Sequence, residues 1–324
     1  MMTRASSFAE IHGDWQALLP QGALDTVFVT PQWQEVWWSE FGDGAEQLLL
    51  CLPGSQGLQG LAPLMRRQGK ITLLGDEDLY DYNDLLVRQG AEVQFYTLLF
   101  DHLKDEDWDI LELFPLPAAS PTLRLAPELA IQRGFQVEIL QEDVCPGLDL
   151  PKDWDGYLGG LSKKDRHELR RKLRRLEGAG DYHWYCRSEP GEVESSLDSF
   201  FALLRLSRED KDRFMTLQRE RFFRKVIGAM AQLGAVRLFF MELEGRQVAS
   251  ALCFDYGPSR MLYNSGFNPE YGYYSVGLLL KALCIKDAIE GGLPYFDFLR
   301  GDEPYKYDLG GKDQVLYRMV VKRS

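Results

Sequence analysis

The segment PYFDFLRGDEPYKYDLGG, residues 294–311, gathers ionisable side chains directly after an apolar run. Its candidates for chemistry are Asp297, Arg300, Asp302, Tyr305 and Lys306. Carboxylates can take a proton from an attacking group, whereas a phenol or an ammonium group can donate a proton or stabilise developing negative charge. The same density of charge is also typical of a solvated loop that follows a buried strand. These residues therefore predict either the edge of an active site or a charged loop.

A second group of candidates opens the segment SVGLLLKALCIKDAIEGG. Ser275 is a good N-cap, and the apolar spacing after it predicts a helix over residues 276–290. The N–H groups of Val276, Gly277 and Leu278 would lack partners within that helix and would favour an anion. Gly277 would let a pyrophosphate approach the backbone closely. The alternative is an ordinary capped helix packed on a sheet, which the residues alone favour.

Two further segments are unusually charged. LLGDEDLYDYNDLL places acidic side chains around two tyrosines, and Asp81, Tyr82 and Asp84 suit an acceptor that carries an amine or sugar hydroxyls. A plain acidic turn is the alternative. SKKDRHELRRKLRRLEG, residues 162–178, holds eight lysines and arginines and predicts a basic helix. It suits the phosphates of a nucleotide-bearing donor, the acceptor end of an RNA, or an anionic lipid, or it is a solvated helix that pairs with acidic residues.

Several kinds of chemistry are disfavoured by what the sequence lacks. The four histidines lie in unrelated segments, so we expect no metal site. Five scattered cysteines without a C-x-x-C pair argue against a disulfide framework and a zinc site. No G-x-S-x-G elbow, P-loop or dinucleotide fingerprint occurs, which disfavours acyl-enzyme, kinase and dehydrogenase functions.

Charge and composition bound the class of protein. The hydrophobic fraction of 45% with 12% aromatic residues is that of a well-cored globular protein. Residues 1–150 carry a net charge of −16 and residues 151–324 a net of +4, so general DNA binding is disfavoured and a local anion site in the second half is permitted. The N-terminus lacks a continuous apolar segment and no run is long enough to span a membrane, so we expect no signal peptide and a cytoplasmic location.

Hydrophobic periodicity then predicts the elements that must position these side chains. In the first half we expect strands at 46–52, 57–66, 71–74, 83–87, 108–114 and 135–140, and helices at 93–103 and 122–132. In the second half we expect strands at 183–187, 236–243, 247–255, 261–266, 295–299 and 315–321, and helices at 163–176, 193–206, 217–233 and 276–290. Trp33 and Trp37 lie four residues apart and predict a helix face pressed into the core.

The stretch DVCPGLDLPKDWDG, residues 143–156, contains Pro and Gly and is interpreted as a linker or domain crossing between domains 1–150 and 151–324. Each half runs three strands, a helix and another strand, which suggests a diverged structural repeat. The predicted fold class is α+β, with mixed, mainly antiparallel sheets flanked by helices.

Taken together, the motifs resemble the CelD-like or BioF-like acetyltransferases of the GNAT superfamily, which are relatives of the Fem-type peptidyltransferases. The resemblance runs from VFVTPQWQEVWWSEFG through LYDYND, LSKKDRHELRRKLRRL and Y-x-S-V-G to FDFLRGDEPYKYDLGG. It implies two tandem GNAT-like domains, a degenerate one over 1–150 and an acyltransferase domain over 151–324. Where the ordinary GNAT donor motif has Q/R-x-x-G-x-G/A, this sequence has Y-G-Y-Y-S-V-G.

The resemblance also implies roles for individual residues. The donor pyrophosphate of an acyl-CoA would bind at Ser275, Val276, Gly277 and Leu278. Lys306 matches the family's aromatic-Lys motif, and we expect it to steady the developing charge or the donor carbonyl. We expect Tyr305 to position or protonate the leaving thiolate, Asp297 or Asp302 to act as the base, and Arg300 to anchor an anionic group of the substrate.

The function expected from these observations is transfer of an acyl group from an acyl-CoA-type thioester to a small-molecule, glycan or peptide amine, in exopolysaccharide or cell-envelope biosynthesis. Two alternatives stay open. One is a Fem-type peptidyltransferase that uses aminoacyl-tRNA, although the helical-hairpin insertion of some Fem proteins is missing. The other is a non-catalytic GNAT-like binding module.

Overall fold

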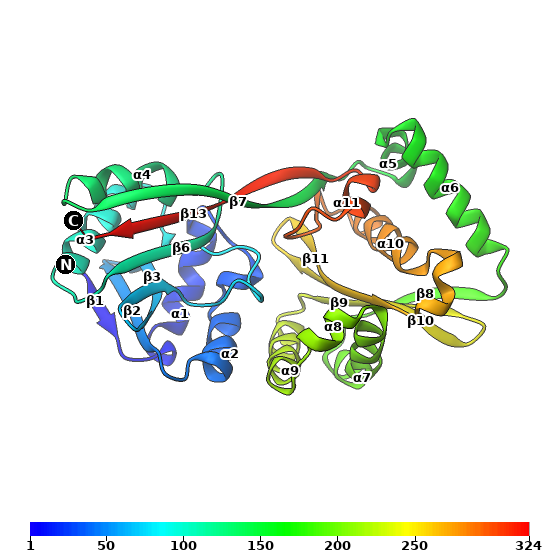
Figure 1. Cartoon of the computed structure of the whole chain (residues 1–324), viewed down its shortest axis with the longest axis horizontal. Helices are drawn as coiled ribbons and strands as arrows, with labels where there is room; N and C mark the ends of the chain where they lie inside the picture. The colour runs from blue at the N-terminus through cyan, green and yellow to red at the C-terminus, as the bar shows by residue number, and fades with distance from the viewer. Residues whose placement is uncertain (324) are drawn as a thin grey trace. The chain divides into compact units, whose positions relative to one another are not determined.

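In the computed structural model, which describes residues 1–323, the chain folds as two compact units (Figure 1). Unit 1 comprises Met1–Val144 together with the C-terminal residues from Gln314 onwards, and unit 2 comprises Cys145–Asp313. The C-terminal strand, which the sequence analysis assigned to the second domain, therefore belongs to the first unit. None of the helices among residues 1–323 is both long and apolar enough to cross a membrane.

Unit 1 is built on a mainly antiparallel sheet in the order β1-β2-β3-β4-β6-β13-β7, with β5 paired to β3. Its strands are β1 (Thr3–Ala5), β2 (Glu46–Gly54), β3 (Gly57–Arg67), β4 (Lys70–Leu73), β5 (Leu86–Val87), β6 (Ile110–Pro117), the first part of β7 (Gln136–Asp149) and most of β13 (Lys312–Lys322). Its helices are α1 (Phe8–Leu18), η1 (Leu19–Gln21), η2 (Val27–Val29), α2 (Pro31–Phe41), α3 (Glu92–Lys104) and α4 (Pro121–Ile131). Only the pair β4–β6 is parallel among the pairs whose register is described in this unit.

The core of unit 1 is strongly aromatic. Helix α3 buries Phe95, Tyr96 and Phe100 in this core, and α4 packs against α3. Helix α2 buries Trp33 and Trp37, as their spacing predicts, because both rings pack edge-on against the ring of Tyr80.

Unit 2 is built on the sheet order β7-β12-β11-β10-β9-β8, in which only β11–β12 is parallel. Its strands are the end of β7, β8 (Tyr182–Arg187), β9 (Val236–Leu243), β10 (Arg246–Tyr256), β11 (Ser259–Phe267) and β12 (Tyr295–Asp297). Its helices are α5 (Trp154–Gly160), α6 (Lys163–Glu177), α7 (Pro190–Ser207), α8 (Glu209–Phe214), α9 (Leu217–Gln232), η3 (Pro269–Tyr274), α10 (Val276–Glu290) and α11 (Pro304–Asp308).

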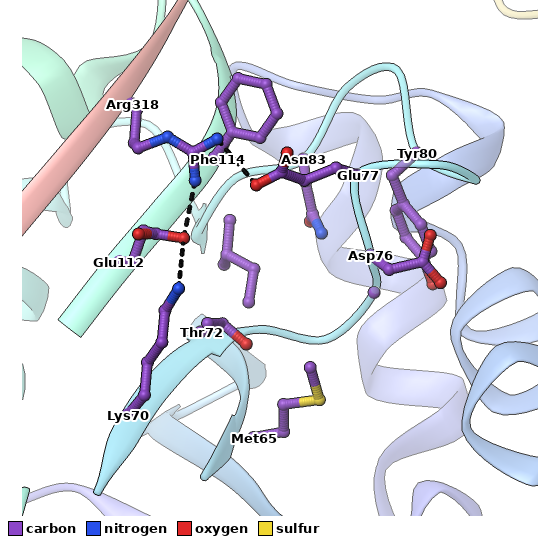
Figure 2. A pocket seen from close by; sticks show the side chains of 12 residues that line it. Met65, Lys70, Thr72, Asp76, Glu77, Tyr80, Asn83, Glu112, Phe114 and Arg318 are labelled. Atoms are coloured by element: carbon purple, nitrogen blue, oxygen red, sulfur yellow. Dashed lines mark hydrogen bonds and ion pairs between the residues drawn. The ribbon is translucent and has the colours of Figure 1, made fainter. Parts of the chain in front are cut away.

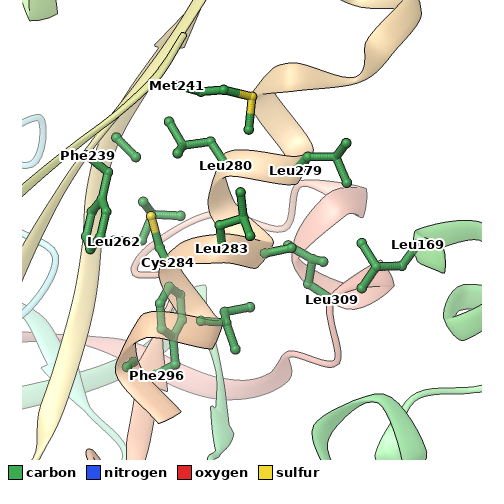
Figure 3. Close-up of a cluster of buried hydrophobic side chains, with 14 of the residues drawn as sticks. Leu169, Phe239, Met241, Leu262, Leu279, Leu280, Leu283, Cys284, Phe296 and Leu309 are labelled. Carbon is green, nitrogen blue, oxygen red and sulfur yellow. The ribbon is translucent and has the colours of Figure 1, made fainter. Parts of the chain in front are cut away.

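Helix α10 is buried on the sheet of unit 2. Two alternate residues of β9, Phe239 and Met241, belong to the same buried apolar cluster as Leu279 and Leu283 of α10 (Figure 3). Because side chains of a strand alternate between the two faces of its sheet, α7 and α9 cover the opposite face (Figure 1). This burial fixes the position of α10, whose first turn carries the candidate anion-binding residues.

The two units repeat one order of elements. In unit 1 the antiparallel strands β2, β3 and β4 are followed by α3 and by β6, which is parallel to β4. In unit 2 the antiparallel strands β9, β10 and β11 are followed by α10 and by β12, which is parallel to β11. The predicted α+β class and the predicted order of three strands, one helix and one strand are thereby confirmed.

The boundary between the two units, after Val144, falls within the stretch 143–156 that was predicted as a linker or domain crossing, but this stretch is not an irregular linker. Strand β7 continues to Asp149, and α5 begins at Trp154. Gly147 is needed within the strand, since a Cβ there would come within 1.9 Å of the Tyr295 hydroxyl oxygen on the paired strand β12. The Pro-Gly pair therefore marks a close approach between strands.

A glycine also sets how closely α7 packs on β11. A Cβ at Gly266 would lie 2.4 Å from backbone atoms of Leu203 and Leu204. We predict that Gly266→Ala lowers the free energy of unfolding by about 2–3 kcal/mol, because the backbone of α7 must move. The control Gly228→Ala, on the exposed side of α9 with open space around it, should instead raise it by about 0.5–1 kcal/mol. Urea denaturation measures both, and equal effects would contradict the packing argument.

Candidate functional site

The candidate site lies where two parallel strands of unit 2 part. Strand β11 pairs with β12 only from Ser259 to Met261, although β11 continues to Phe267. Strand β12 ends at Asp297, whose carboxylate accepts a hydrogen bond of 2.7 Å from the backbone N–H of Leu299. Leu299 has a φ of +58°, a conformation that a branched side chain rarely adopts. The sequence analysis extended this strand to Leu299, and the turn at that residue is what ends it early.

Beside this opening is a cavity of about 320 Å³. Residues of β11, η3, α10, α6 and α11 line it: Phe267, Gly272, Ser275, Val276, Gly277, Leu278, Lys281, Lys172 and Tyr305. All four residues predicted to bind the donor are among them, as is Tyr305. The cavity thus combines the first turn of a long helix with two lysines and apolar walls.

Ser275 does not cap α10 as the sequence predicts. Its φ of +57° and ψ of +33° place it in the left-handed region, and its side chain accepts no hydrogen bond from the helix. Its carbonyl oxygen accepts the N–H of Leu279. The N–H groups of Val276, Gly277 and Leu278 lack a carbonyl one turn earlier within the helix. A strained residue in place of a capping side chain leaves this helix start open to a ligand.

A glycine is required at position 277 because a side chain there would collide with the wall of the cavity. A Cβ at this position would lie 2.8 Å from Cδ1 of Phe267, closer than real Cβ contacts allow. By contrast, Gly272 lines the same cavity and has open space around it. The absence of a side chain at Gly277 therefore keeps both the helix turn and the aromatic ring in place.

The basic helix α6 is held beside the cavity. Arg175 donates a hydrogen bond of 2.6 Å to the carbonyl oxygen of Tyr273, and its guanidinium lies 4.6 Å from the centre of that ring. Lys172, one turn earlier, lines the cavity. Of the remaining basic side chains of α6, those of Lys163, Lys164, Arg170, Arg171 and Arg174 are exposed.

Lys306 is buried beneath the loop that follows β12. Its ammonium group donates to the carbonyl oxygens of Leu299, Arg300 and Gly301 at 2.7–2.9 Å and lies 2.9 Å from the Glu303 carboxylate. A lysine has three N–H donors, and four acceptors surround them here. The predicted loop contains the short helix α11, which brings Lys306 into this position. In this structure Lys306 positions the loop, and it is not among the residues that line the cavity.

The other predicted residues of this segment differ in exposure. Tyr305 faces the cavity, and burial raises the pKa of its phenol well above the usual value, so the hydroxyl stays protonated. Asp297 is buried and holds the turn at Leu299, whereas Asp302 is exposed and Arg300 is half-buried. Burial tends to raise the pKa of Glu303, but the hydrogen bond and charge of Lys306 outweigh it and hold that pKa below its usual value.

The three predicted acceptor residues lie in unit 1. Asp84 is 1% exposed and accepts hydrogen bonds from the hydroxyl groups of Ser120 and Thr122. Burial raises the pKa of Asp84 to about 6, against the effect of these hydrogen bonds. Tyr82 is buried, and Asp81 is half-buried. Asp84 is therefore a structural carboxylate, and composition could not reveal this because its partners are 36 and 38 residues away in sequence.

A polar cavity of about 170 Å³ lies beside the same acidic loop in unit 1 (Figure 2). Arg318 of β13 forms ion pairs there with Glu77 and Glu112, and Lys70 reaches the same oxygen atom of Glu112. Asp76 accepts a hydrogen bond from the indole N–H of Trp37. Much of the acidic charge predicted to meet a substrate thus contacts the protein's own cations and donors.

Sequence reasoning missed two lysines. Lys281 is 8% exposed and lies on the wall of the unit 2 cavity. Lys211, on the unpredicted helix α8, donates to the carbonyl of Ser265 and to the side chain of Asn264. Lys281 did carry a signal, since it is a lone cation within the apolar run LLLKALC, four residues after Gly277.

The comparisons with known proteins decide the family of this site. Residues 163–307 match the family described as Acetyltransferase (GNAT) domain. The match begins at α6 and ends in α11, so it contains every residue that lines the cavity. This chain carries a GNAT acetyltransferase domain. The predicted relationship to the CelD-like group of this superfamily is confirmed.

The fold of the whole chain is also shared with solved structures. FemX is similar over 98% of this chain and 96% of its own, with a TM-score of 0.68 and 13% identity. A protein of unknown function from Bacteroides thetaiotaomicron is similar over 100% of both chains, with a TM-score of 0.63 and 10% identity.

A third similar structure is the C-terminal domain of a protein named as a lysylphosphatidylglycerol synthetase, from Agrobacterium fabrum. It covers 97% of this chain and 92% of its own, with a TM-score of 0.58 and 10% identity. At these identities the similarity concerns the fold alone. No curated protein matches the chain.

The contacts of Lys306 lead to a prediction on stability. Lys306→Met should lower the free energy of unfolding by about 3 kcal/mol, because three carbonyl oxygens and Glu303 lose their donor. The control Lys322→Met removes an exposed lysine at the end of β13 and should change it by less than about 0.5 kcal/mol. Thermal and urea denaturation of both variants test this. An Lys306→Met protein of unchanged stability would show that the lysine is free for another role.

Proposed function

We propose that the GNAT domain transfers an acyl group from an acyl-CoA-type thioester to an amine acceptor. The observation that carries this proposal is the cavity at the first turn of α10, where open backbone N–H groups, Lys172 and a glycine without room for a side chain meet. Membership of the GNAT family implies the acyl-CoA co-substrate. The choice of an amine as the acceptor is part of our proposal and rests on the reaction described below.

The residues present fit the diphosphate of such a donor. The N–H groups of Val276, Gly277 and Leu278 would donate to its oxygens, aided by the dipole of the fifteen-residue helix. Lys172 would approach from α6. The pantetheine arm would then pass Phe267 and Tyr305 towards the opening between β11 and β12.

The reaction we propose is direct attack of a neutral amine on the thioester carbonyl. Nitrogen forms a bond to the acyl carbon, the carbon–sulfur bond breaks, and the thiolate leaves. Tyr305 is the proposed proton donor to that thiolate, because its phenol stays protonated at neutral pH. Asp302, exposed at the same loop, is the proposed acceptor of the amine proton, with Arg300 as the anchor for an anionic group of the substrate.

An enzyme nucleophile is not needed in this scheme. Burial raises the pKa of Cys51 to about 11 and that of Cys186 to about 12, so neither thiol is ionised at neutral pH. Of the acceptor residues expected in unit 1, Asp84 and Tyr82 are buried and Asp81 is half-buried. A glycan or peptide amine, in polysaccharide or cell-envelope biosynthesis, is the acceptor class that we propose.

A second candidate function is transfer from aminoacyl-tRNA. The observation in its favour is the exposed basic side chains of α6, a helix that also lines the donor cavity. Binding of RNA by such a helix would weaken steeply as salt is added, because counterions are released. Turnover with acyl-CoA in the absence of RNA would exclude this candidate.

We predict that Gly277→Ala weakens acyl-CoA binding at least about tenfold, because the added methyl group displaces Phe267 and fills the helix turn. Gly272→Ala is the matched control, since it lines the same cavity with room for a Cβ, and its affinity should stay within about twofold. Calorimetry with a panel of acyl-CoA thioesters measures both variants.

The same titrations, combined with thiol release in the presence of amine acceptors, test the proposed function itself. Binding followed by acceptor-dependent thiol release supports it. Wild-type protein that binds no acyl-CoA would refute the proposed donor, and binding without thiol release for any amine would refute the proposed reaction.

A further inference from the structure

Lys281 is a buried cation on the wall of the donor cavity. It is 8% exposed, and its ammonium group contacts only the Gly277 carbonyl oxygen, at 3.2 Å, and the face of the Tyr305 ring, 4.6 Å from its centre. Within residues 1–323 no carboxylate lies within ion-pair distance of it. A buried charge without a counter-ion is costly, so such a group favours an anionic ligand that enters the cavity beside it.

The surroundings of Lys281 add positive charge. The titratable or charged groups that face it are Cys284 on its own helix, Cys253 on β10, Lys211 on α8, Lys172 on α6, Tyr305 and Lys306 on α11, and Glu303 before α11. The single carboxylate of this set, Glu303, is already paired with Lys306. Three lysines, Lys211, Lys281 and Lys306, interact electrostatically with this one carboxylate, so positive charge is in excess around Lys281.

The position of Lys281 relates it to the open helix start. It lies one turn after Gly277 and extends back along the helix, so its Nζ reaches the level of the first turn. Lys281 and the residues of that turn line the same cavity, so a phosphate bound to the N–H groups of the turn would share the cavity with this ammonium group. A flexible lysine side chain can move to contact it.

We propose that Lys281 is a second anion-binding residue of the donor cavity and that it takes up a proton as the diphosphate of the donor binds. This inference rests on the proposed acyl-CoA function, but it concerns the diphosphate and not the acyl group. It also explains why a lysine interrupts the apolar face of the most buried helix of unit 2.

The direction of the pH effect follows from burial. Burial lowers the pKa of Lys281 to about 8, against the opposing effects of Cys284 and Glu303. A bound phosphate stabilises the charged form and raises that pKa again. Binding therefore takes up protons near pH 8, and affinity falls as the pH rises above this value. Lys211, with a pKa lowered by burial to about 8, makes the same linkage steeper if it also contacts the anion.

The experiment is calorimetric titration of the full-length protein with acetyl-CoA and, separately, with ADP, in buffers of different ionisation enthalpy. Because the second pKa of a phosphate monoester is about 6, the phosphates of both ligands are mainly ionised above pH 7.5. The thiol of acetyl-CoA is blocked by the acetyl group. The wild type should take up about 0.5 proton per ligand at pH 8, and its dissociation constant should rise about eightfold between pH 7.5 and 9.0.

Two variants test whether Lys281 is the group that takes up the proton. Lys281→Met removes a buried charge, should bind at least about tenfold more weakly at pH 7.5, and should lose most of the proton uptake. Lys286→Met, on the same helix but paired with Glu290 and not part of the cavity, should behave as the wild type. Zero proton uptake by the wild type would overturn the inference without any variant, as would undiminished uptake in Lys281→Met.

The two ligands separate this inference from the proposed function. If acetyl-CoA binds without dependence on Lys281, the inference fails and the proposed donor stands. If ADP shows the dependence on Lys281 but acetyl-CoA does not bind, the inference holds and the proposed donor fails. If neither ligand binds, both are refuted.

Discussion

The parting of β11 and β12 is the feature on which the arrangement of the site depends. Two parallel strands that stop pairing expose backbone carbonyl groups, and buried carbonyl groups need donors. In this protein lysine side chains supply them. Lys306 donates to three carbonyls of the chain that leaves β12, and Lys211 donates to the carbonyl of Ser265 on the part of β11 beyond the pairing. These lysine hydrogen bonds replace those that a paired neighbouring strand would make, and they thereby stabilise the separation of β11 and β12.

The use of lysine side chains as donors to backbone carbonyl groups has an electrostatic consequence. Ammonium groups that satisfy backbone carbonyls are buried with little opposite charge, and Lys281 adds another beside the same opening. The first turn of α10 adds the positive end of a helix dipole. A chain with an overall charge of −12 therefore concentrates positive potential in one cavity of its GNAT domain. Such a cavity attracts anionic ligands by its own construction.

Much of the fold was accessible from sequence. The strand Val236–Leu243 and the helix Val276–Glu290 have the predicted bounds, because long periodic apolar patterns leave little choice between helix and strand. Tyr305, Gly277 and the basic helix were also found, since aromatic, glycine and charge patterns are local. The stretch 143–156 does contain the boundary between the two units, but its Pro-Gly pair lies within strand β7 and not in an irregular linker. Gly147 lies close to Tyr295, about 150 residues away, and no local pattern contains that approach.

The sequence by itself determined the class of fold, the order of elements in each unit and the motifs of the GNAT domain, because each of these depends on the residues of one short segment. Tertiary structure decided what the individual charges do. Asp84 meets two hydroxyl groups of α4 and its cap, Lys306 meets three carbonyls, and Lys281 meets an open cavity. These side chains look equally available in the sequence. Burial and partners distant along the chain separate them, because the cost of an ionised group depends on what surrounds it in space.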